Sequence, residues 1–415
     1  MTTTFTNLRL CHRGQLLENR SLVISYSTGL IVDPAQATES NAIDLEGAIV
    51  APGFIELQTN GMKGFHFTHF TDKDSYASKI NEVAHYLPST GVTAFYATIP
   101  TVHSDDFKKI LPSLAPRDID GSASLLGAHA EGPYLHPSKK GAHNASLFHL
   151  PSQKNPASVY GPAAEDNSTL KLVTLAPELD GTENLVFHLS YRGIRTSLGH
   201  SSATYAQGLA ALKAGASCLT HTLNAMAPLH HRDPGLAGLI TAGRETLVDA
   251  APPYFSIIPD GNHLHPAVAT MLFRSNPEKC LIITDSIEMA GLPDGTYPGH
   301  AQIPFNQTKK GSRVVIEGTS RFSISPTLHS RYFRILQMAA SSGNIAIEDG
   351  FLRILILVDR TLALGFYYRH RLEEAEGLSA LALTHARHYS ELEQDGPNKR
   401  RVATRMSLKT LRSRK

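Results

Sequence analysis

Polar residues that could bind a metal ion or move protons stand directly after the apolar, strand-like runs of this sequence. A lone histidine in such a place is ordinarily a hydrogen-bonded structural residue. Here five separate runs each end in Glu, His or Asp, and a buried charge is costly unless it meets a partner or a metal ion. The pattern therefore favours one shared site. The residues are Glu131, His200, His221, Asp260 with His263, and Asp285.

Two imidazoles and one carboxylate make a three-ligand set suited to a catalytic divalent ion, with a fourth position left for water. Zinc lowers the pKa of such a water to about 7. A further carboxylate must move protons, and Asp285 is the candidate general base and acid. This chemistry would hydrolyse an amide or an ester. The donors stand about 70 and 21 residues apart and form no short regular motif, and iron, cobalt and manganese accept the same donor types.

The runs that carry these residues alternate with helix-like stretches. They include VTAFYATIPT, SLLGAHAEGP, LKLVTLAPE, GIRTSLGH, ASCLTHTLNAM, YFSIIPDGNH and KCLIITDS. Seven or eight strand–helix units in about 240 residues predict an α/β fold, a TIM-like (β/α)8 barrel, whose catalytic groups lie at the carboxyl ends of the strands. Residues 201–214 are expected to form one helix, capped by Ser201 or Ser202 and ended by Gly215.

The chain divides into three parts that differ in their pattern of apolar and polar residues. Residues 1–51 alternate apolar and polar in short pieces broken by Gly, Asn and Pro, which predicts hairpins in a small β-sandwich layer. Residues 52–319 hold the barrel pattern, and residues 320–415 match neither part. The pieces GFLRILILVDRTLALGFYY and RLEEAEGLSALALTHARHYSELE of this last part could form apolar or amphipathic helices.

Composition narrows the class of protein. The 415 residues carry a formal charge of +2, but eight Lys and Arg residues follow residue 398 without an acid, so the rest is mildly acidic. This argues against a nucleic-acid surface on the folded part. The three cysteines, Cys11, Cys218 and Cys280, show no pairing pattern, which predicts a reducing compartment. With no leader-like start and no apolar run of membrane-spanning length, we expect a cytoplasmic protein without a membrane partner.

A set of motifs carries a family resemblance. They are APGFIELQTNG, GAHAEGPYLHPSKKGAHN, LVTLAPE, SLGHSSATYAQGLAALKAGA, LTHTLNAMAPLHHRDPGLAG, PDGNHLHP, ITDS and AGLPDGTY. In this order, from about residue 5 to Thr319, the sequence resembles the N-acetylglucosamine-6-phosphate deacetylases, a family of the amidohydrolase superfamily. The resemblance covers roughly three quarters of the chain, and it implies the metal-dependent amidohydrolase type of barrel.

The resemblance also implies a single-metal site. Most of the superfamily carries a His-x-His pair after the first strand to hold a second metal ion, whereas this sequence has Gln58 and Asn60. Neutral amides are poor ligands for a transition metal. The family pattern implies Glu131, His200 and His221 as ligands of one divalent ion, for which we expect Zn²⁺. It disfavours a dihydroorotase or dihydropyrimidinase, which generally need the paired histidines.

The remaining roles are carried over by position. The resemblance implies that His263 contacts the substrate and polarises the scissile carbonyl, and that Asp285 takes a proton from water and delivers one to the leaving amine. Arg232 is the phosphate candidate, because a guanidinium matches phosphate oxygens; a polar surface turn is the alternative for HHRDPG. Ala142 and His143 would line the sugar site, and Asn224 and Ala225 would lie near the phosphate. The products would be glucosamine 6-phosphate and acetate, in amino-sugar catabolism.

After VVIEGT the resemblance stops. A changed reading frame or a retained intron in the gene would explain this ending. The family implies a homodimer, and several alternatives stay open. One is an inactive or unstable homologue, because the family's closing segments are missing. A second is a non-catalytic product whose basic tail binds an acidic partner or nucleic acid. A third is a deacetylase of another N-acetylated sugar or of an N-acylated amino acid.

Overall fold

The computed structural model describes residues 2–12, 15–25, 27–28, 30–36, 41–243, 252–300, 305–311 and 313–316. Within these residues the chain forms two compact units, one of residues 2–55 with 87–94 and one of residues 56–86 with 95–316. The predicted domain boundary after residue 51 stays a prediction. The predicted segment 320–415, with its candidate helices and basic tail, lies outside the described residues.

The first unit contains a five-stranded sheet. Its strands are β1 (Thr2–His12), β2 (Gln15–Ser25), β3 (Ile31–Val32), β4 (Asn41–Asp44) and β5 (Ile49–Val50), in the order β3-β2-β1-β4, with β5 also pairing with β1. β1 and β2 form the antiparallel hairpin that the alternating pattern predicts. Apolar side chains of β1, β2 and β5 form its core, among them Leu8, Leu22 and Val50.

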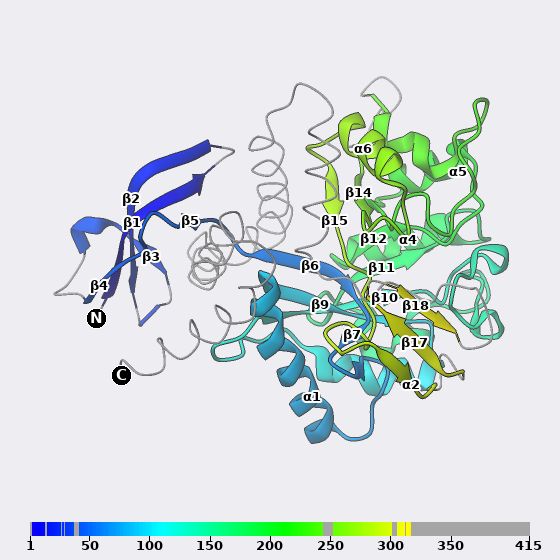
Figure 1. Cartoon of the computed structure of the whole chain (residues 1–415). Helices are drawn as coiled ribbons and strands as arrows, with labels where there is room; N and C mark the ends of the chain where they lie inside the picture. Colours follow the sequence, from blue (N-terminus) through cyan, green and yellow to red (C-terminus); the bar gives the residue numbers. More distant parts are fainter. Residues whose placement is uncertain are drawn as a thin grey trace. The chain divides into compact units, whose positions relative to one another are not determined.

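The second sheet has eight strands in the order β15-β14-β13-β12-β11-β10-β9-β6, which is the order of the chain (Figure 1). Neighbours from β10 to β15 pair in parallel. All eight residues of β10 are buried, as expected for a strand covered on both faces. The bounds are β6 (Phe54–Thr59), β9 (Val92–Pro100), β10 (Ser124–Glu131), β11 (Leu170–Leu175), β12 (Arg195–Leu198), β13 (Cys218–Leu219), β14 (Tyr254–Ile257) and β15 (Cys280–Ile282).

The first and last strands of this sheet meet. Thr59 in β6 forms a parallel bridge with Ser286, which follows β15. The backbone N–H of Asp285 donates to the Gln58 carbonyl at 2.9 Å, and the N–H of Asn60 donates to the Ser286 carbonyl at 2.7 Å. These contacts close the sheet on itself, so the predicted barrel is confirmed. They also fix the register that sets Gln58 beside Asp285.

Helices connect the strands. They are α1 (Lys73–Tyr86), α2 (Ser104–Ile110), α3 (Pro156–Tyr160), α4 (Thr182–Tyr191), α5 (Tyr205–Lys213) and α6 (Pro266–Ser275). α5 confirms the helix expected within residues 201–214, but the expected cap is wrong. Thr204 caps it, in a capping box with Gln207. Ser201 cannot, because its backbone forms a bridge with Met226 and its hydroxyl donates to Glu178 at 2.7 Å.

Short strands follow β6 and β15 along the chain. β7 (Gly61–Met62) and β8 (Phe65–His66) form a hairpin, and β16 (Gly295–Tyr297), β17 (Gln307–Lys310) and β18 (Arg313–Ile316) form an antiparallel sheet. Tyr297 and Val314 of this sheet pack against Ile287 and Met289. None of the helices in the described ranges is both long and apolar enough to cross a bilayer.

Candidate active site

Four of the predicted site residues lie at the carboxyl ends of barrel strands. Glu131 is the last residue of β10, His200 and His221 follow β12 and β13 by two residues, and Asp285 follows β15 by three. All four side chains are buried. His200, His221 and Asp285 have φ values of 49°, 30° and 46°. This left-handed conformation is strained for such residues and tends to collect at functional sites.

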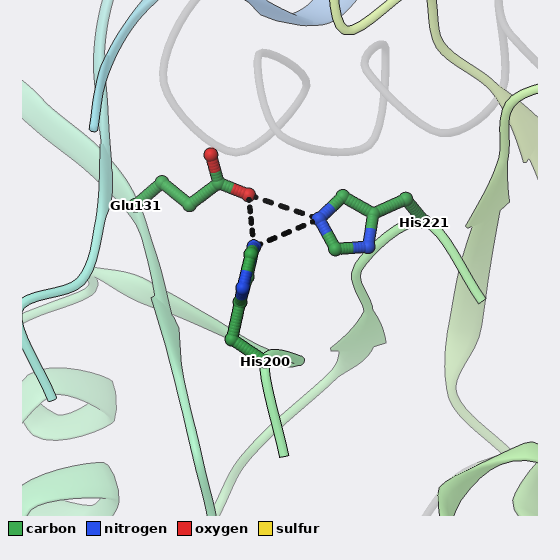
Figure 2. Close-up of side chains that lie close together, drawn as sticks. All are labelled: Glu131, His200 and His221. Carbon is green, nitrogen blue, oxygen red and sulfur yellow. Dashed lines mark hydrogen bonds and ion pairs between the residues drawn. The ribbon is translucent and has the colours of Figure 1, made fainter. Parts of the chain in front are cut away.

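Glu131, His200 and His221 point toward one another (Figure 2). Glu131 Oε1 lies 3.3 Å from His200 Nε2 and 3.1 Å from His221 Nε2, and the two Nε2 atoms are 3.1 Å apart. The ligand atoms of these three residues all lie within 4.8 Å of one another. The structure therefore brings together the three residues that the sequence predicts as metal ligands.

The opposite nitrogen of each ring indicates what this cluster can bind. His200 Nδ1 lies 2.8 Å from the Lys139 carbonyl, and His221 Nδ1 lies 3.2 Å from the Asn224 carbonyl. A carbonyl only accepts, so Nδ1 of each ring carries a proton, and the neutral form of each ring presents its lone pair at Nε2. Two imidazole nitrogens and a carboxylate oxygen that face one point can hold a cation between them. This donor set fits a divalent transition metal ion.

The second oxygen of Glu131 faces another histidine. His143 Nε2 lies 3.6 Å from Glu131 Oε2, and His143 Nδ1 lies 3.0 Å from the Thr101 hydroxyl. Burial raises the pKa of Glu131, but contacts with its three histidine neighbours outweigh burial and hold the pKa well below its usual range. Glu131 is therefore ionised and ready to bind a cation. His143, predicted in the sugar site, lies beside the carboxylate of the cluster.

Two amides hold Asp285. Gln58 Nε2 donates to Glu131 Oε1 at 2.8 Å and to Asp285 Oδ1 at 3.3 Å, and Asn60 Nδ2 donates to the same Asp285 oxygen at 2.9 Å. Burial, followed by the negative charge of Glu131, raises the pKa of Asp285 above its usual value. A carboxylate with a raised pKa is a better proton acceptor, which suits a general base.

His263 lies at the rim with a buried partner. Its Nδ1 is 2.9 Å from Asp260 Oδ2, and its backbone N–H donates to Asp260 Oδ1 at 2.7 Å. The Asp260 side chain is fully buried, whereas the His263 side chain is 21% exposed. Since Asp260 accepts at Nδ1, Nε2 of His263 is left for a ligand. The positive charge that His263 can carry lowers the pKa of Asp285, so the two groups interact electrostatically.

The residues predicted to bind the substrate differ in their exposure and in their contacts. Asn224 has its Nδ2 atom buried with no hydrogen-bond partner among the described residues. Ala225 has a φ of 48°, and its carbonyl accepts from the Ser201 N–H at 3.0 Å. Ala142 is exposed. Arg232 is also exposed, and its guanidinium makes no hydrogen bond or ion pair within the described part of the chain.

Sequence reasoning gave no role to several groups that shape this site. The sequence pattern shows Gln58 and Asn60 only as amides in place of a metal-binding histidine pair, yet they are the donors that hold Asp285. The sequence pattern shows Asp260 as a strand-end residue but does not identify it as the partner of His263. The sequence signal that could have identified Gln58 and Asn60 is their position at the carboxyl end of the first barrel strand. In a closed barrel, the last strand pairs with this first strand.

Comparisons with known proteins agree with this geometry. No family model matches the sequence. A curated N-acetylglucosamine-6-phosphate deacetylase of Caenorhabditis elegans is 35% identical over 309 residues, 74% of this chain and 71% of that protein. The deacetylase of the same name from Homo sapiens is 36% identical over 71% of each chain.

Solved structures give the same result. The N-acetyl-D-glucosamine-6-phosphate deacetylase of Mycobacterium smegmatis, solved as a variant in complex with N-acetyl-D-glucosamine-6-phosphate, is 26% identical with a TM-score of 0.69. The match covers 85% of this chain and 87% of that one. The Pasteurella multocida deacetylase, 22% identical with a TM-score of 0.73 over 90% of this chain and 92% of that one, shares the fold. The chain belongs to the N-acetylglucosamine-6-phosphate deacetylase family of metal-dependent amidohydrolases.

Proposed function

We propose that this protein hydrolyses the N-acetyl group of N-acetylglucosamine 6-phosphate to glucosamine 6-phosphate and acetate, in amino-sugar catabolism. The observation that carries the proposal is the convergence of two imidazole nitrogens and a carboxylate oxygen beside a second carboxylate, Asp285, which amide side chains hold. Family membership supplies the substrate class, because the relatives from Caenorhabditis elegans and Homo sapiens carry this activity in their names.

Glu131, His200 and His221 hold one divalent ion in this proposal, and zinc is the ion we expect. Support comes from the two Nδ1 contacts with backbone carbonyls, which turn both Nε2 lone pairs toward Glu131. A bound ion of this kind supplies a Lewis acid for the acetyl oxygen and lowers the pKa of water. The remaining chemistry belongs to the side chains.

Asp285 acts first as the base and then as the acid. It accepts a proton from the attacking water, whose oxygen forms a bond to the acetyl carbon. When the carbon–nitrogen bond breaks, Asp285 returns the proton to the amine, so water and amide become acetate and amine. His263 donates from Nε2 to the carbonyl oxygen, with Asp260 holding the ring in place. Gln58 and Asn60 keep Asp285 Oδ1 oriented during both transfers.

The sugar phosphate is bound by residues around this centre. The unpartnered Nδ2 of Asn224 supports a role for that side chain toward the ligand, next to the backbone of Ala225. Arg232 supplies the cation for the phosphate, and its exposed, unpaired guanidinium in the described structure is consistent with that role. Ala142 and His143 line the sugar side. We expect the protein to act as a homodimer in the cytoplasm; both stay predictions.

A second substrate is an N-acetylhexosamine phosphate of different ring stereochemistry. The curated N-acetylgalactosamine-6-phosphate deacetylase of Escherichia coli O157:H7 is 34% identical over 72% of this chain and 74% of that protein. The two sugars differ only at one hydroxyl, away from the amide and the phosphate. The site residues described above act on groups that both sugars share, so a direct comparison of substrates must decide between them.

The test is acetate release by the full chain from four substrates: the two 6-phosphates, unphosphorylated N-acetylglucosamine and an N-acetylated amino acid. We expect the highest kcat/KM for N-acetylglucosamine 6-phosphate. Arg232→Ala should raise KM for the phosphorylated sugars and leave KM for N-acetylglucosamine nearly unchanged. Equal effects on both kinds of sugar would remove Arg232 from phosphate recognition. No turnover of any substrate would favour the inactive homologue, and salt-dependent nucleic-acid binding by that protein would favour the basic-tail alternative.

A further inference from the structure

A carboxylate without a role in the proposed reaction contacts the chain directly after the ligand His200. Glu178 follows β11 by three residues and is half-buried. Its Oε2 atom accepts from the Ser201 hydroxyl at 2.7 Å, and its Oε1 atom accepts from the Ser202 N–H. Glu178 therefore holds two consecutive residues beside His200 with both of its oxygens.

Ser201 connects this contact to the second histidine ligand. It is fully buried, its N–H donates to the Ala225 carbonyl at 3.0 Å, and its own carbonyl accepts from the Ala227 N–H at 3.0 Å. The neighbouring carbonyl, that of Asn224, is the one that lies 3.2 Å from His221 Nδ1. The Ser201–Ala225 hydrogen bond thus fixes the position of the peptide that orients the His221 ring.

The backbone on both sides of this hydrogen bond is strained. His200 has a φ of 49° and Ala225 a φ of 48°. Residues other than glycine keep this left-handed conformation only where the surrounding contacts hold them in it. The Lys139 carbonyl orients the His200 ring through Nδ1, but the position of Nε2 also depends on the backbone. Glu178 supplies an anchor for that backbone, because hydrogen bonds to a carboxylate are stronger than those to a neutral acceptor.

We propose that Glu178 is a positioning residue for the metal centre. Through Ser201 it keeps the Nε2 atoms of His200 and His221 directed at the point that Glu131 also faces. The inference rests on the proposed function, because it concerns the ion expected at these three ligands. Partners that orient metal ligands without binding the metal typically change metal affinity by about 10- to 100-fold when they are removed. Loss of the Glu178 contacts should therefore weaken zinc binding rather than abolish it.

The zinc affinity of the full chain tests this inference. Metal-stripped protein competes for Zn²⁺ with a chromophoric chelator, and the absorbance of the chelator gives the dissociation constant. Glu178→Gln keeps the size of the side chain, but its amide has one acceptor oxygen for two donors, the Ser201 hydroxyl and the Ser202 N–H. We expect the dissociation constant to rise by about tenfold or more. An affinity equal to that of the wild type would overturn the proposal.

Glu165→Gln is the matched control. Glu165 is exposed and forms an ion pair with Arg192 at 3.2 Å, which joins the segment after α3 to the end of α4. The variant also replaces a glutamate by a glutamine, but it leaves the segments after β12 and β13 in place, so it should bind zinc as the wild type does. A zinc affinity lowered as much as in Glu178→Gln would mean that the loss of one negative charge is sufficient, which contradicts a positioning role.

Ser201→Ala tests the same contact from its other side and is a smaller change. It removes the hydroxyl but keeps the backbone hydrogen bonds to Ala225 and Ala227. Zinc affinity should fall in this variant. The double variant with Glu178→Gln should lose less affinity than the product of the two single effects, because both changes remove the same hydrogen bond. Fully multiplicative effects would mean that the two residues act separately, against the proposal.

Amide hydrogen exchange distinguishes a positioning role from poor folding. In stripped protein, Glu178→Gln should exchange faster than the wild type at residues 201–203 and 224–227, and at the same rate in α6. Faster exchange throughout, α6 included, would mean general destabilisation and would overturn the positioning role. None of these measurements depends on deacetylation. A wild type that binds zinc but releases no acetate would defeat the proposed function alone, whereas a wild type that binds no zinc would defeat both.

Discussion

At the scale of residues, the site is built from donors whose partners fix their direction. His200 and His221 are turned by backbone carbonyls, His263 by Asp260, and Asp285 by two amides. The convergence of Glu131, His200 and His221 could be predicted from the sequence, because each stands at the end of a strand and parallel barrel strands end at one mouth. The roles of Gln58 and Asn60 could not, since they depend on how the last strand is aligned with the first.

Loss of the proposed base should separate chemistry from ion binding. Asp285→Asn keeps the size of the side chain but cannot accept the proton, so we expect kcat to fall by about 10²- to 10⁴-fold. Bound zinc, measured in the same preparation, should be unchanged, because Asp285 is not among the three donors. Activity within tenfold of the wild type would exclude Asp285 as the base.

Asn60 should tune the pH at which Asp285 works. Its hydrogen bond lowers the pKa of Asp285, so removing the donor in Asn60→Leu raises that pKa further. The base acts when ionised, and activity is lost as pH falls through its pKa. The acid limb of kcat/KM should therefore move to higher pH in the variant, while KM at neutral pH should change little. An unmoved limb would reduce Asn60 to a structural residue.

At the scale of elements, the strands and helices follow the sequence pattern, while the short pieces at the mouth do not. Apolar runs of four residues, such as residues 94–97 in β9 and residues 125–128 in β10, predict strands that are largely buried, and the structure has them so. The cap of α5 was placed wrongly because Ser201, Ser202 and Thr204 all suit a helix start, and only the tertiary contact of Ser201 with Glu178 decides among them. The β7–β8 hairpin carries too few residues to show a period.

Gly61 should be the least replaceable residue of that hairpin. Its φ is 148°, and a Cβ atom there would lie 2.1 Å from the Phe65 carbonyl oxygen, which is backbone and cannot give way. Gly121→Ala is the matched control, because its φ is also positive, at 61°, but a Cβ would meet nothing within 4 Å. Denaturant unfolding should show a loss of about 1–2 kcal/mol for the control and a clearly larger loss for Gly61→Ala. Equal losses would mean that the hairpin adjusts freely.

At the scale of the whole molecule, the chain combines the barrel of its family with three cysteines that form no disulfide bond. Cys11, Cys218 and Cys280 are free thiols, in agreement with the lack of a pairing pattern in the sequence. The composition predicted this, and it also predicted a mildly acidic body. The composition does not predict how residues 320–415 contribute to the fold or to the active site. These residues match no pattern of the family, and they lie outside the described residues.

The thiols should be inert in the native protein. Burial raises the pKa of Cys11 and of Cys218 to about 11, and it raises that of Cys280 still more. Because the thiolate is the reactive form, a thiol reagent at pH 8 should modify fewer than one cysteine per chain in native protein and all three in denaturant. Rapid native labelling of all three would mean that the barrel and the first unit open readily.

The most direct test of the central claim is acetate release from N-acetylglucosamine 6-phosphate by the full chain before metal stripping, after stripping by a chelator, and after Zn²⁺ is returned. We predict that turnover falls to background on stripping and returns with Zn²⁺ in the wild type, but not in His221→Asn. Turnover that survives stripping, or that Zn²⁺ restores equally in His221→Asn, would contradict an ion held by Glu131, His200 and His221.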